Sequence, residues 1–433
     1  MFITSIQWDN FHKKLEEFLE KTASHTDDNF DPGGYYKAIW PRDASYILKD
    51  QFLSTTKNDI NKRMLEALFT IWSYQITGSS KEKLIFGRGS PEMKFKPIEA
   101  NEKTLESFAG ALPTTIYRKD GILEVYARKP DIDSTALMIS TTSRILCRLL
   151  LSDKISQRER SEAVNFLVPR MLRAVDYLKK RDIDNDGLLE QDHNEDWMDT
   201  ILRRGRIVYS QASFILGLRD LSVLQLQLEH KKQARSIAGL AEKTIQAVDK
   251  KLWSDEDDAY IDIQDQEEHI GGPYRTLTQD VALLLIAITE NLPDDSKIEE
   301  SSQLYKRADS TLETMKKRIW KDRWPLVTEV ELEKSGPWVL KPNQYHNHTF
   351  WPWATGIEML ARFRFNKIED CNTLFLKLAS EDEPHIHTFY EWINPLTDKV
   401  QGAYPFRTGV SAVRIALFEI LAKTNAAKMN TTG

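Results

Sequence analysis

Apolar residues recur along this 433-residue chain with the 3.6-residue period of amphipathic helices, and the pattern predicts twelve helical segments. In chain order they cover residues 5–22, 42–56, 59–76, 133–151, 157–181, 207–228, 230–252, 277–291, 300–320, 349–365, 367–380 and 408–424. Ser156 and Glu159 form a capping-box pattern that supports the start of the fifth segment. Two stretches, 88–98 and 117–127, alternate enough to form a β-hairpin, and Lys119-Asp-Gly121 supplies turn chemistry.

These helices are of two alternating kinds. Every second segment, such as 133–151 or 277–291, is apolar or small on nearly all faces, which is typical of a buried helix. The intervening segments, such as 230–252, are amphipathic and charged on one side. Alternating inner and outer helices predict an all-α toroid, the (α/α)6 barrel, in which six inner helices run parallel. We expect one domain over residues 1–424 and a frayed C-terminal tail at 425–433.

Six short polar and aromatic clusters lie just before, or at the start of, the inner segments. They cover residues 40–43, 131–134, 195–199, 275–280, 346–351 and 390–394. Because parallel inner helices bring these ends to one mouth of the barrel, the sequence predicts a single pocket there, and the long loops leading to it are of the kind that carries function. Aromatic faces combined with a few placed polar groups suit a small neutral polyol such as a sugar.

Two acidic clusters occupy opposite positions in the predicted ring. Glu195, Asp196 and Asp199 precede the third inner segment, and Glu391 precedes the sixth. Inverting glycoside hydrolysis needs a carboxylic acid that protonates the leaving oxygen and an opposed carboxylate that activates water, roughly 6.5–9.5 Å away. The two clusters therefore suggest an acid and base pair. The simpler alternative is that Asp199 caps a helix and Glu391 lies at the surface.

The cluster at 40–43 contains groups that can recognise a sugar. Arg42 offers a rigid fork of donors, Asp43 can accept two hydroxyl hydrogens, and Trp40 offers a flat apolar face to a pyranose ring. The alternative is a local ion pair at a helix start. The further candidates for sugar binding are Asp133, Glu195, Asp196, Trp197, Asn347, Trp351 and Trp392.

Metal and cofactor signals are weak. The pairs His346/His348 and His385/His387 have no Cys or carboxylate at tight ligand spacing, so we expect loop packing and hydroxyl hydrogen bonds from them rather than metal binding. The stretch 182–187 resembles the start of a calcium loop, but His193 stands where an EF-hand needs glutamate, which favours a simple turn. Phosphate-loop, dinucleotide and serine-hydrolase motifs are absent from the sequence. We expect no cofactor and no metal.

Composition narrows the class further. The net charge is −6 without a basic stripe, which argues against nucleic acid as a partner. The longest apolar run, 281–288, is too short to cross a bilayer, and the N-terminus does not have the pattern of a signal peptide. Cys147 and Cys371 are expected to be buried thiols of a reducing compartment. The expectation is a cytoplasmic, soluble protein with a carbohydrate substrate; the sequence is silent on oligomeric state.

Several motifs resemble those of (α/α)6 glycoside hydrolases, a group that includes glucoamylases, the glucosidase domain of glycogen debranching enzymes and the neutral/alkaline invertases. Tyr35-Tyr36-Lys-Ala-Ile-Trp-Pro-Arg-Asp43 resembles the glucoamylase segment that holds the terminal glucose. Asp196-Trp-Met-Asp199 resembles the Trp-Met-Asp of debranching enzymes, although glucoamylases carry Glu where this chain has Met198. Phe389-Tyr-Glu391, followed by Gly402 and a final helix, is similar to the segment of the catalytic base.

The resemblance implies an inverting, exo-acting hydrolase of α-glucosides with Asp199 as general acid and Glu391 as general base. Asp199 would keep its proton because of the charges of Glu195 and Asp196 and the apolar Trp197, whereas Glu391 would be ionised in a wetter position. The alternatives are a sugar epimerase, lyase or phosphorylase on the same barrel, in which the histidines would matter more, or a non-catalytic carbohydrate-binding protein.

Overall fold

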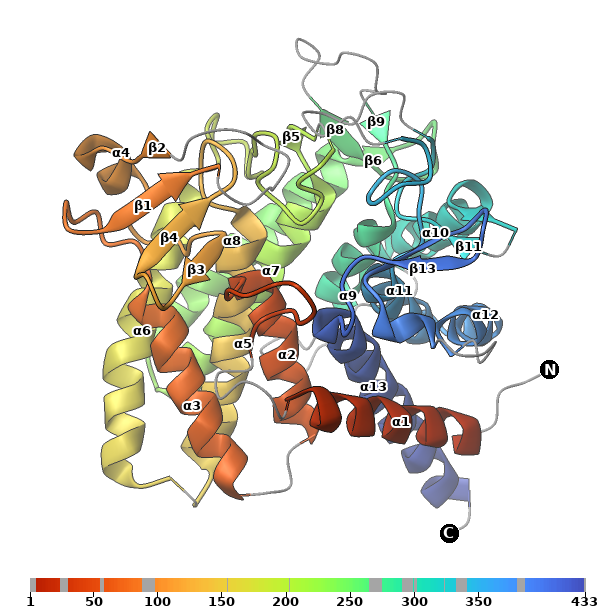
Figure 1. Cartoon of the computed structure of the whole chain (residues 1–433), viewed down its shortest axis with the longest axis horizontal. Coiled ribbons are helices and arrows are strands. Elements are labelled where there is room, and N and C mark those ends of the chain that lie inside the picture. Colours follow the sequence, from red (N-terminus) through yellow and green to blue (C-terminus); the bar gives the residue numbers. More distant parts are fainter. Residues whose placement is uncertain are drawn as a thin grey trace.

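The computed structural model describes residues 5–23, 30–54, 58–87, 98–153, 155–201, 203–264, 275–289, 299, 302–322, 324–331, 341–379 and 386–431. Helices dominate these ranges (Figure 1). They are α1 (Ser5–Ala23), α2 (Pro41–Ser54), α3 (Asn58–Ser73), α4 (Glu102–Ser107), α5 (Ile132–Leu151), α6 (Gln157–Lys179), α7 (Val208–Gln227), α8 (Lys231–Lys251), α9 (Ala282–Thr289), α10 (Gln303–Arg318), α11 (Pro352–Arg364), α12 (Ile368–Leu378) and α13 (Arg407–Thr431).

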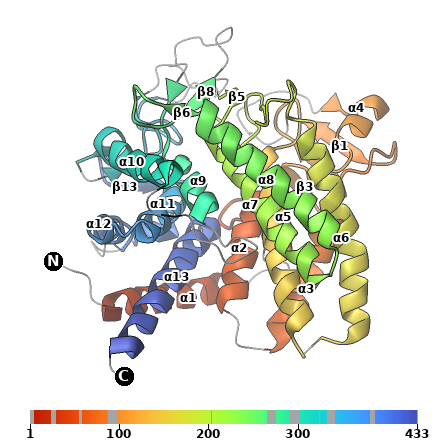
Figure 2. The ribbon, with the colours of Figure 1, turned by 180° about the vertical axis from the view of Figure 1, so that it is seen from behind.

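Six of these helices form a closed ring. Going round it, α2 packs on α5, α5 on α7, α7 on α9, α9 on α11, α11 on α13, and α13 returns to α2. Outer helices cover them: α3 lies on α2, α6 on α5, α8 on α7, α12 on α11 and α1 on α13, and Figure 2 shows α8 lying along α7. The predicted (α/α)6 toroid is therefore confirmed, and α7 and α13 stand opposite each other in the ring.

The inner helices are buried as their composition predicts. All residues of α9 from Ala282 to Ile288 are buried, and α7 buries polar as well as apolar side chains along most of its length. Outer helices such as α8 bury only the apolar stripe that faces the ring. The buried apolar residues form two large clusters, one around α3, α5 and α6 and the other inside α7, α9, α11 and α13.

Most helix ends lie within three residues of the predicted positions. The capping box of Ser156 and Glu159 is present at the start of α6. Two ends differ more. A 3-10 turn, Gln279–Val281, precedes α9, so this helix starts later than predicted, and α13 continues to Thr431, beyond the expected end at 424. The short α4 was not predicted.

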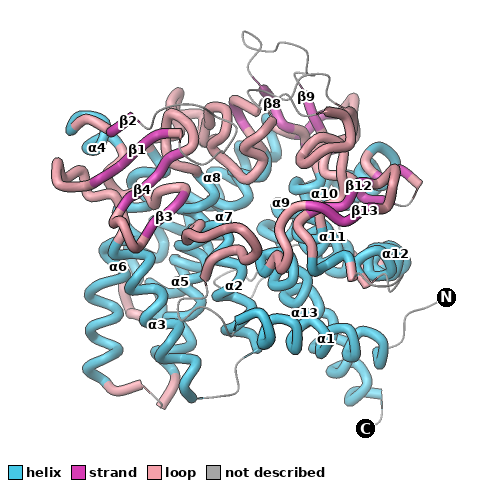
Figure 3. The backbone as a smooth tube through the Cα atoms, viewed as in Figure 1, coloured by secondary structure: helices cyan, strands magenta, loops and turns pink. Residues whose placement is uncertain are grey.

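Short strands gather toward one end of the barrel, the upper end in Figure 3. The largest sheet has the order β2-β1-β4-β3. Its strands β3 and β4 form an antiparallel hairpin whose turn contains the predicted Lys119 to Gly121, whereas β1 pairs with β4 in parallel. Residues 88–97 of the predicted hairpin lie outside the described residues. The strands are β1 (Lys83–Phe86), β2 (Ile98–Glu99), β3 (Thr115–Tyr117) and β4 (Ile122–Val125).

The remaining strands tie the mouth loops to one another. A three-stranded sheet has the order β5-β8-β9, and three two-stranded ladders pair β6 with β7, β10 with β11, and β12 with β13. Their bounds are β5 (Gly205–Arg206), β6 (Trp253–Ser254), β7 (Ala259–Tyr260), β8 (Asp262–Gln264), β9 (Arg275–Thr276), β10 (Trp320–Lys321), β11 (Trp324–Pro325), β12 (Trp392–Asn394) and β13 (Lys399–Gln401).

Two further expectations concern membrane-spanning helices and the state of the two cysteines. None of the helices in the described ranges has the length and apolar character needed to span a bilayer. Cys147 is half-buried and Cys371 is buried, and both are free thiols.

Inner helices α5 and α7 approach each other closely at Gly217. A Cβ atom at this position would lie 2.7 Å from the carbonyl oxygen of Ala136 and 3.5 Å from the Cβ of Ile139. The absence of a side chain therefore sets the spacing of these two helices. Gly239 on the outer helix α8 differs, because a Cβ atom there would have nothing within 4 Å of it.

We expect Gly217→Ala to lower the free energy of unfolding by about 1–3 kcal/mol, because the added methyl group forces α5 and α7 apart. The matched change Gly239→Ala should raise it by up to about 1 kcal/mol, because alanine favours the helix and meets no neighbour. Urea midpoints of the two variants and the parent measure both effects. A Gly217→Ala variant as stable as Gly239→Ala would contradict the close approach.

Candidate active site

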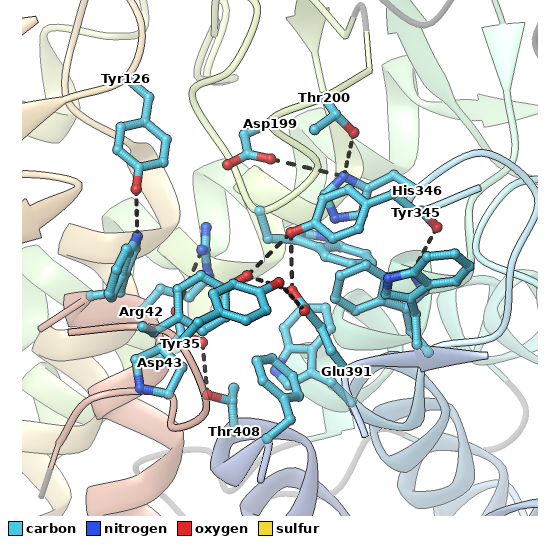
Figure 4. Close-up of a pocket in the computed structure, with 18 of the residues that line it drawn as sticks. Tyr35, Arg42, Asp43, Tyr126, Asp199, Thr200, Tyr345, His346, Glu391 and Thr408 are labelled. Carbon is cyan, nitrogen blue, oxygen red and sulfur yellow. Dashed lines mark hydrogen bonds and ion pairs between the residues drawn. The ribbon is translucent and has the colours of Figure 1, made fainter. Parts of the chain in front are cut away.

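The loops before the inner helices surround a cavity of about 360 Å³, within the size range of small-molecule sites (Figure 4). Its walls come from segments far apart in the sequence, as the clustering of polar and aromatic residues predicts. The lining residues lie at positions 32, 35–36, 40, 42–43, 126, 197, 199–200, 344–346, 351, 353, 391–392, 406 and 408.

Glu391, in the loop before α13, accepts four hydrogen bonds although its side chain is buried. The hydroxyls of Tyr36 and Tyr345 donate to Oε1 over 2.5 and 3.0 Å. Oε2 accepts from the hydroxyl of Tyr35 at 2.8 Å and from the backbone N–H of Ala403 at 2.7 Å. Burial raises the pKa of Glu391, and these donors oppose that shift because they bind the ionised carboxylate.

Gly402 makes room for this carboxylate. It has φ +76°, in the left-handed region that favours glycine. A Cβ atom here would collide with Oε2 of Glu391 and would lie 2.7 Å from the Cβ of the same residue. Only glycine therefore leaves Glu391 in its observed position.

Asp199 lies in the loop before α7, across the ring from Glu391, and both carboxyl groups line the cavity (Figure 4). Burial raises the pKa of Asp199 to about 7; Arg42 opposes this shift, while the charges of Asp196, Glu391 and Asp133 add to it. A carboxyl group with this pKa is about half protonated at pH 7 and mostly protonated below it. The alternatives of a helix-capping Asp199 and a surface Glu391 are excluded, because α7 begins after Ile207 and Glu391 is 1% exposed.

The side chain of Asp199 is 23% exposed, more than that of Glu391. The prediction that Glu391 occupies the wetter position is therefore wrong. Protein donors, rather than water, solvate the charge of Glu391. The clusters could not show this, because all four donors lie outside them, at Tyr35, Tyr36, Tyr345 and Ala403.

Arg42 and Asp43 enter the cavity from the first turn of α2. Arg42 lies 3.4 Å from Asp43, 3.5 Å from Asp133 and 3.9 Å from Asp131. Asp43 also accepts a hydrogen bond of 2.7 Å from the hydroxyl of Thr408 at the start of α13. The ion pair foreseen as the simpler alternative is thus present, and both of its members also face the cavity.

Aromatic rings form the floor and one wall of the cavity. Trp197 packs against Trp351 and Trp353, with ring centroids 5.5 and 4.4 Å away. Below them Trp353 meets Tyr46, 5.5 Å away, inside the ring of helices. The indole N–H of Trp40 donates to the hydroxyl of Tyr126 over 3.0 Å on another wall. The cavity is therefore closed toward the centre of the barrel.

Four of the predicted sugar-binding residues do not line the cavity. All four are buried behind its wall. Asp133 lies next to Arg42, Glu195 is paired with Arg181, Asp196 with Arg203, and the Asn347 amide donates to the carbonyl of Lys341. The six that do line it are Trp40, Arg42, Asp43, Trp197, Trp351 and Trp392.

The pairing of Glu195 with Arg181 changes the explanation of the raised pKa of Asp199. Asp196 contributes to raising it, as predicted, but Glu195 is not among the main causes, because its carboxylate is bound to Arg181 and to the N–H of Asp192. Burial is the largest cause.

Sequence reasoning also missed lining residues. Tyr345 and Gln344 directly precede the fifth cluster, and Thr408 opens the last inner helix, so their positions carried a signal. The position of Tyr126 gave no such signal, because this residue directly follows strand β4 and lies outside the predicted clusters.

His346 lines the cavity next to Asp199. Its Nδ1 lies 2.7 Å from the hydroxyl of Thr200 and 3.9 Å from Asp199 Oδ1. Burial, assisted by Arg42 and Arg203, holds the pKa of His346 well below 6.5, so the ring is neutral. His348 and His387 bond backbone carbonyls, as expected for loop packing, and His385 lies outside the described residues.

The turn at 182–187 contains the carboxylates of Asp182, Asp184 and Asp186, whose oxygens lie within 4.8 Å of one another. Basic side chains already neutralise this turn: Arg206 contacts Asp184 and Asp186, and Lys251 lies 2.5 Å from Asp186. These contacts support a turn held by ion pairs rather than a calcium site.

A buried charge cluster holds the loop that carries Asp199. Arg203 lies 3.1 Å from Asp196, 3.0 Å from Asp262 and 2.8 Å from Asp280. Asp280 in turn accepts the indole N–H of Trp197 at 2.6 Å. Burial raises the pKa of Asp262 to about 7 and also raises that of Asp196. One guanidinium group thus ties three loops together beneath the cavity.

The fold is shared with known glycosidases. No protein-family model and no curated protein sequence matches the chain. Among solved structures, it is similar to the family 63 mannosylglycerate hydrolase from Thermus thermophilus in complex with glucose, with a TM-score of 0.62 and 16% identity over 94% of this chain and 99% of that one. It is also similar to the glucoamylase from Saccharomycopsis fibuligera, with a TM-score of 0.62 and 12% identity over 97% of each chain. At such identities the likeness establishes the (α/α)6 fold.

We expect Arg203→Ala to lower the free energy of unfolding by about 3–5 kcal/mol, because it removes the shared cation of three buried carboxylates. Arg206→Ala is the matched control: its partners Asp184 and Asp186 lie in a partly exposed turn, where the loss should stay below about 1 kcal/mol. Guanidinium midpoints at pH 7 compare the two. Equal losses would contradict the role of Arg203 as the anchor.

Proposed function

We propose that this protein is an inverting, exo-acting glycoside hydrolase that acts on small α-glucosides. The observation that supports the proposal most is the pair Asp199 and Glu391. They reach one cavity from opposite sides of the ring, and burial raises the pKa of both, but four hydrogen bonds to the carboxylate oppose this shift at Glu391. Asp199 retains its proton to about pH 7, whereas Glu391 is bound by four donors that favour its charge. Opposed environments of this kind distinguish an acid from a base.

In the reaction, the carboxyl group of Asp199 donates its proton to the glycosidic oxygen while the bond from that oxygen to the anomeric carbon breaks. A water molecule attacks the anomeric carbon from the opposite face, and Glu391 accepts the proton that this water loses. The sugar leaves with a new hydroxyl of inverted configuration. Glu391 then returns its proton to solvent, and Asp199 regains one.

The closed floor of the cavity favours the end of a sugar chain. Trp353 and Trp197 block the way toward the centre of the barrel, so a saccharide can enter only with its terminal unit. Arg42 and Asp43 would bind hydroxyls of that unit, and Trp40 would cover a ring face. The volume of about 360 Å³ suits a substrate of one or two sugar units at the low end of the range for ligand sites.

The similar structures agree with this class of substrate. The mannosylglycerate hydrolase has been solved with glucose, and also with Tris and D-glycerate, and the second similar structure is a glucoamylase. Sugars linked to glycerate and α-linked glucose disaccharides are therefore the first substrates to test.

The other reactions considered for this barrel fit the cavity less well. A phosphorylase needs a cationic site for phosphate, yet Arg42 is the sole cation among the described lining residues and already faces three carboxylates. An epimerase needs histidines free to exchange protons. His346 is neutral, and its Nδ1 is engaged with Thr200.

We expect the parent protein to release glucose from at least one of maltose, isomaltose, panose, trehalose, sucrose and glucosylglycerate, or mannose from mannosylglycerate. Asp199→Asn and Glu391→Gln should each lower kcat by roughly 10²–10⁴-fold, because each removes a proton-transfer group. Azide should partly restore turnover to the Glu391 variant. The control Asp184→Asn, in the partly exposed turn, should retain full activity. Full activity in Asp199→Asn would refute the acid assignment.

The pH profile provides a separate test. Asp199 must be protonated to act, and its pKa is about 7, so kcat/KM should fall as pH rises through about 7. The limb at low pH belongs to Glu391, which must be ionised. With a substrate whose leaving group needs no proton, such as a glucosyl fluoride, the limb near pH 7 should disappear in the parent. A limb that persists with this substrate would mean that another group sets it.

A further inference from the structure

The four hydrogen bonds to Glu391 leave no acceptor position for a water molecule. An ionised carboxylate has about four lone-pair positions. Tyr36 and Tyr345 occupy both positions on Oε1, and Tyr35 and the N–H of Ala403 occupy both on Oε2. A base that activates water must accept a hydrogen bond from that water. One of the four donors must therefore leave before Glu391 can act.

Three of the donors are held in place by their surroundings. The Tyr36 ring packs on Trp40, 5.0 Å away, and the Tyr345 ring packs on His346 and Trp351, 4.3 and 5.1 Å away. The third donor is backbone, in a loop that is bonded twice to the residue it serves, because the N–H of Glu391 donates to the carbonyl of Ala403 as well. Moving any of these three would disturb the wall of the cavity.

Tyr35 is different. Its side chain lines the mouth of the cavity, and the residue is 59% exposed, the most exposed of the four donors. Its ring packs on Tyr36 at 4.6 Å, and Figure 4 shows its hydroxyl reaching Glu391 from the side of the cavity. A rotation of this side chain into solvent would release one position on Oε2 without moving any buried group.

The chain segments on either side of Oε2 are fixed by close backbone contacts. Gly402 lies against this oxygen, where any side chain would collide with it. On the same side Gly33 and Gly34, which precede Tyr35, pack closely against residues 403–405, so the chain carrying Tyr35 is anchored while its side chain points into the mouth. Because the exposed donor Tyr35 bonds Oε2, it is Oε2, rather than Oε1, that becomes accessible to water when this side chain leaves.

We infer that Tyr35 is a positioning residue that occupies the water site of Glu391 in the free protein and leaves it when the sugar binds. This inference rests on the proposed function. The entering sugar displaces the phenol, a water molecule takes the vacated position on Oε2, and its proton passes to that oxygen as it attacks. The Tyr35 hydroxyl keeps its own proton throughout, and it closes the water site again when the product leaves.

The inference predicts a difference between two pH profiles. The profile of kcat/KM reports the free enzyme, in which Tyr35 still donates to Glu391, and that of kcat reports the substrate complex, from which it has left. Tyr35→Phe should therefore move the acid limb of kcat/KM upward by about one pH unit and leave the acid limb of kcat in place, because loss of a donor raises the pKa of a carboxyl group. Tyr36→Phe, which removes a permanent donor, should move both limbs.

The comparison of these two variants decides the role of Tyr35. If Tyr35→Phe moves both limbs equally, as Tyr36→Phe should, the Tyr35 hydroxyl stays on Glu391 throughout the reaction and the inference is wrong. It is wrong as well if Tyr35→Phe lowers kcat by about tenfold or more, because a displaced group makes no contact in the transition state. A kcat within about threefold of the parent supports displacement.

A crystal structure with D-glucose bound is a readout that does not depend on turnover. We expect the Tyr35 hydroxyl turned away from Oε2 and a water molecule in its place. A hydroxyl that remains within about 3.2 Å of Oε2 beside a bound sugar would overturn the inference. Failure of the protein to hydrolyse any glycoside would refute the proposed function instead, and the position of Tyr35 in the glucose complex would still decide whether sugar displaces it.

Discussion

The mouth of this barrel concentrates more buried carboxylates than its buried cations can neutralise, and the site depends on that imbalance. Arg42 faces Asp43, Asp131 and Asp133, and Arg203 faces Asp196, Asp262 and Asp280. Like charges in a poorly solvated region cannot all ionise, so some of these groups keep protons near neutral pH. The raised pKa values of Asp131, Asp133 and Asp262 follow from burial in this way.

Burial raises the pKa of both Asp199 and Glu391, but the groups around the two carboxyls differ. Asp199 is surrounded by negative charge and its pKa rises to about 7, which suits a proton donor. Glu391 is buried more deeply, but three tyrosine hydroxyls and a backbone N–H supply the hydrogen bonds that its charge needs. The closed ring places these two groups on opposite sides of one cavity because α7 and α13 stand opposite each other. Helix packing at the centre of the barrel thus determines the separation of these two carboxyl groups.

Much of the fold follows from local patterns in the sequence. Apolar or small residues on nearly all faces of α5 and α9 mark inner helices, and the charged stripe of α8 marks an outer one, because burial on one face leaves a helical period that burial on all faces lacks. The ends of α9 and α13 do not follow from such a pattern. A 3-10 turn of two polar residues and a valine, Gln279–Val281, precedes α9, and α13 continues to Thr431 through a stretch of mixed polar and apolar residues.

The site was predictable at the level of segments, and only partly at the level of side chains. Four of the six clusters, at 40–43, 195–199, 346–351 and 390–394, contribute residues that line the cavity, whereas those at 131–134 and 275–280 contribute none. Within a cluster, however, Asp196 points to Arg203 and Asp199 to the cavity, although they are three residues apart. Loop backbone conformation decides this direction, and sequence carries no periodic signal for it. Tyr35 shows the same limit: its sequence neighbours indicate a sugar site, but only the geometry places its hydroxyl on Glu391.

The most direct test of the opposed acid and base is the anomer of the first product, followed by proton NMR during hydrolysis of whichever α-glucoside is cleaved fastest. Water that attacks from the side of Glu391 while Asp199 protonates the leaving oxygen on the other side inverts the anomeric carbon. We therefore expect β-glucose to accumulate first and α-glucose to follow only by mutarotation. Early α-glucose would mean retention of configuration, which would contradict the opposed arrangement of Asp199 and Glu391 as acid and base.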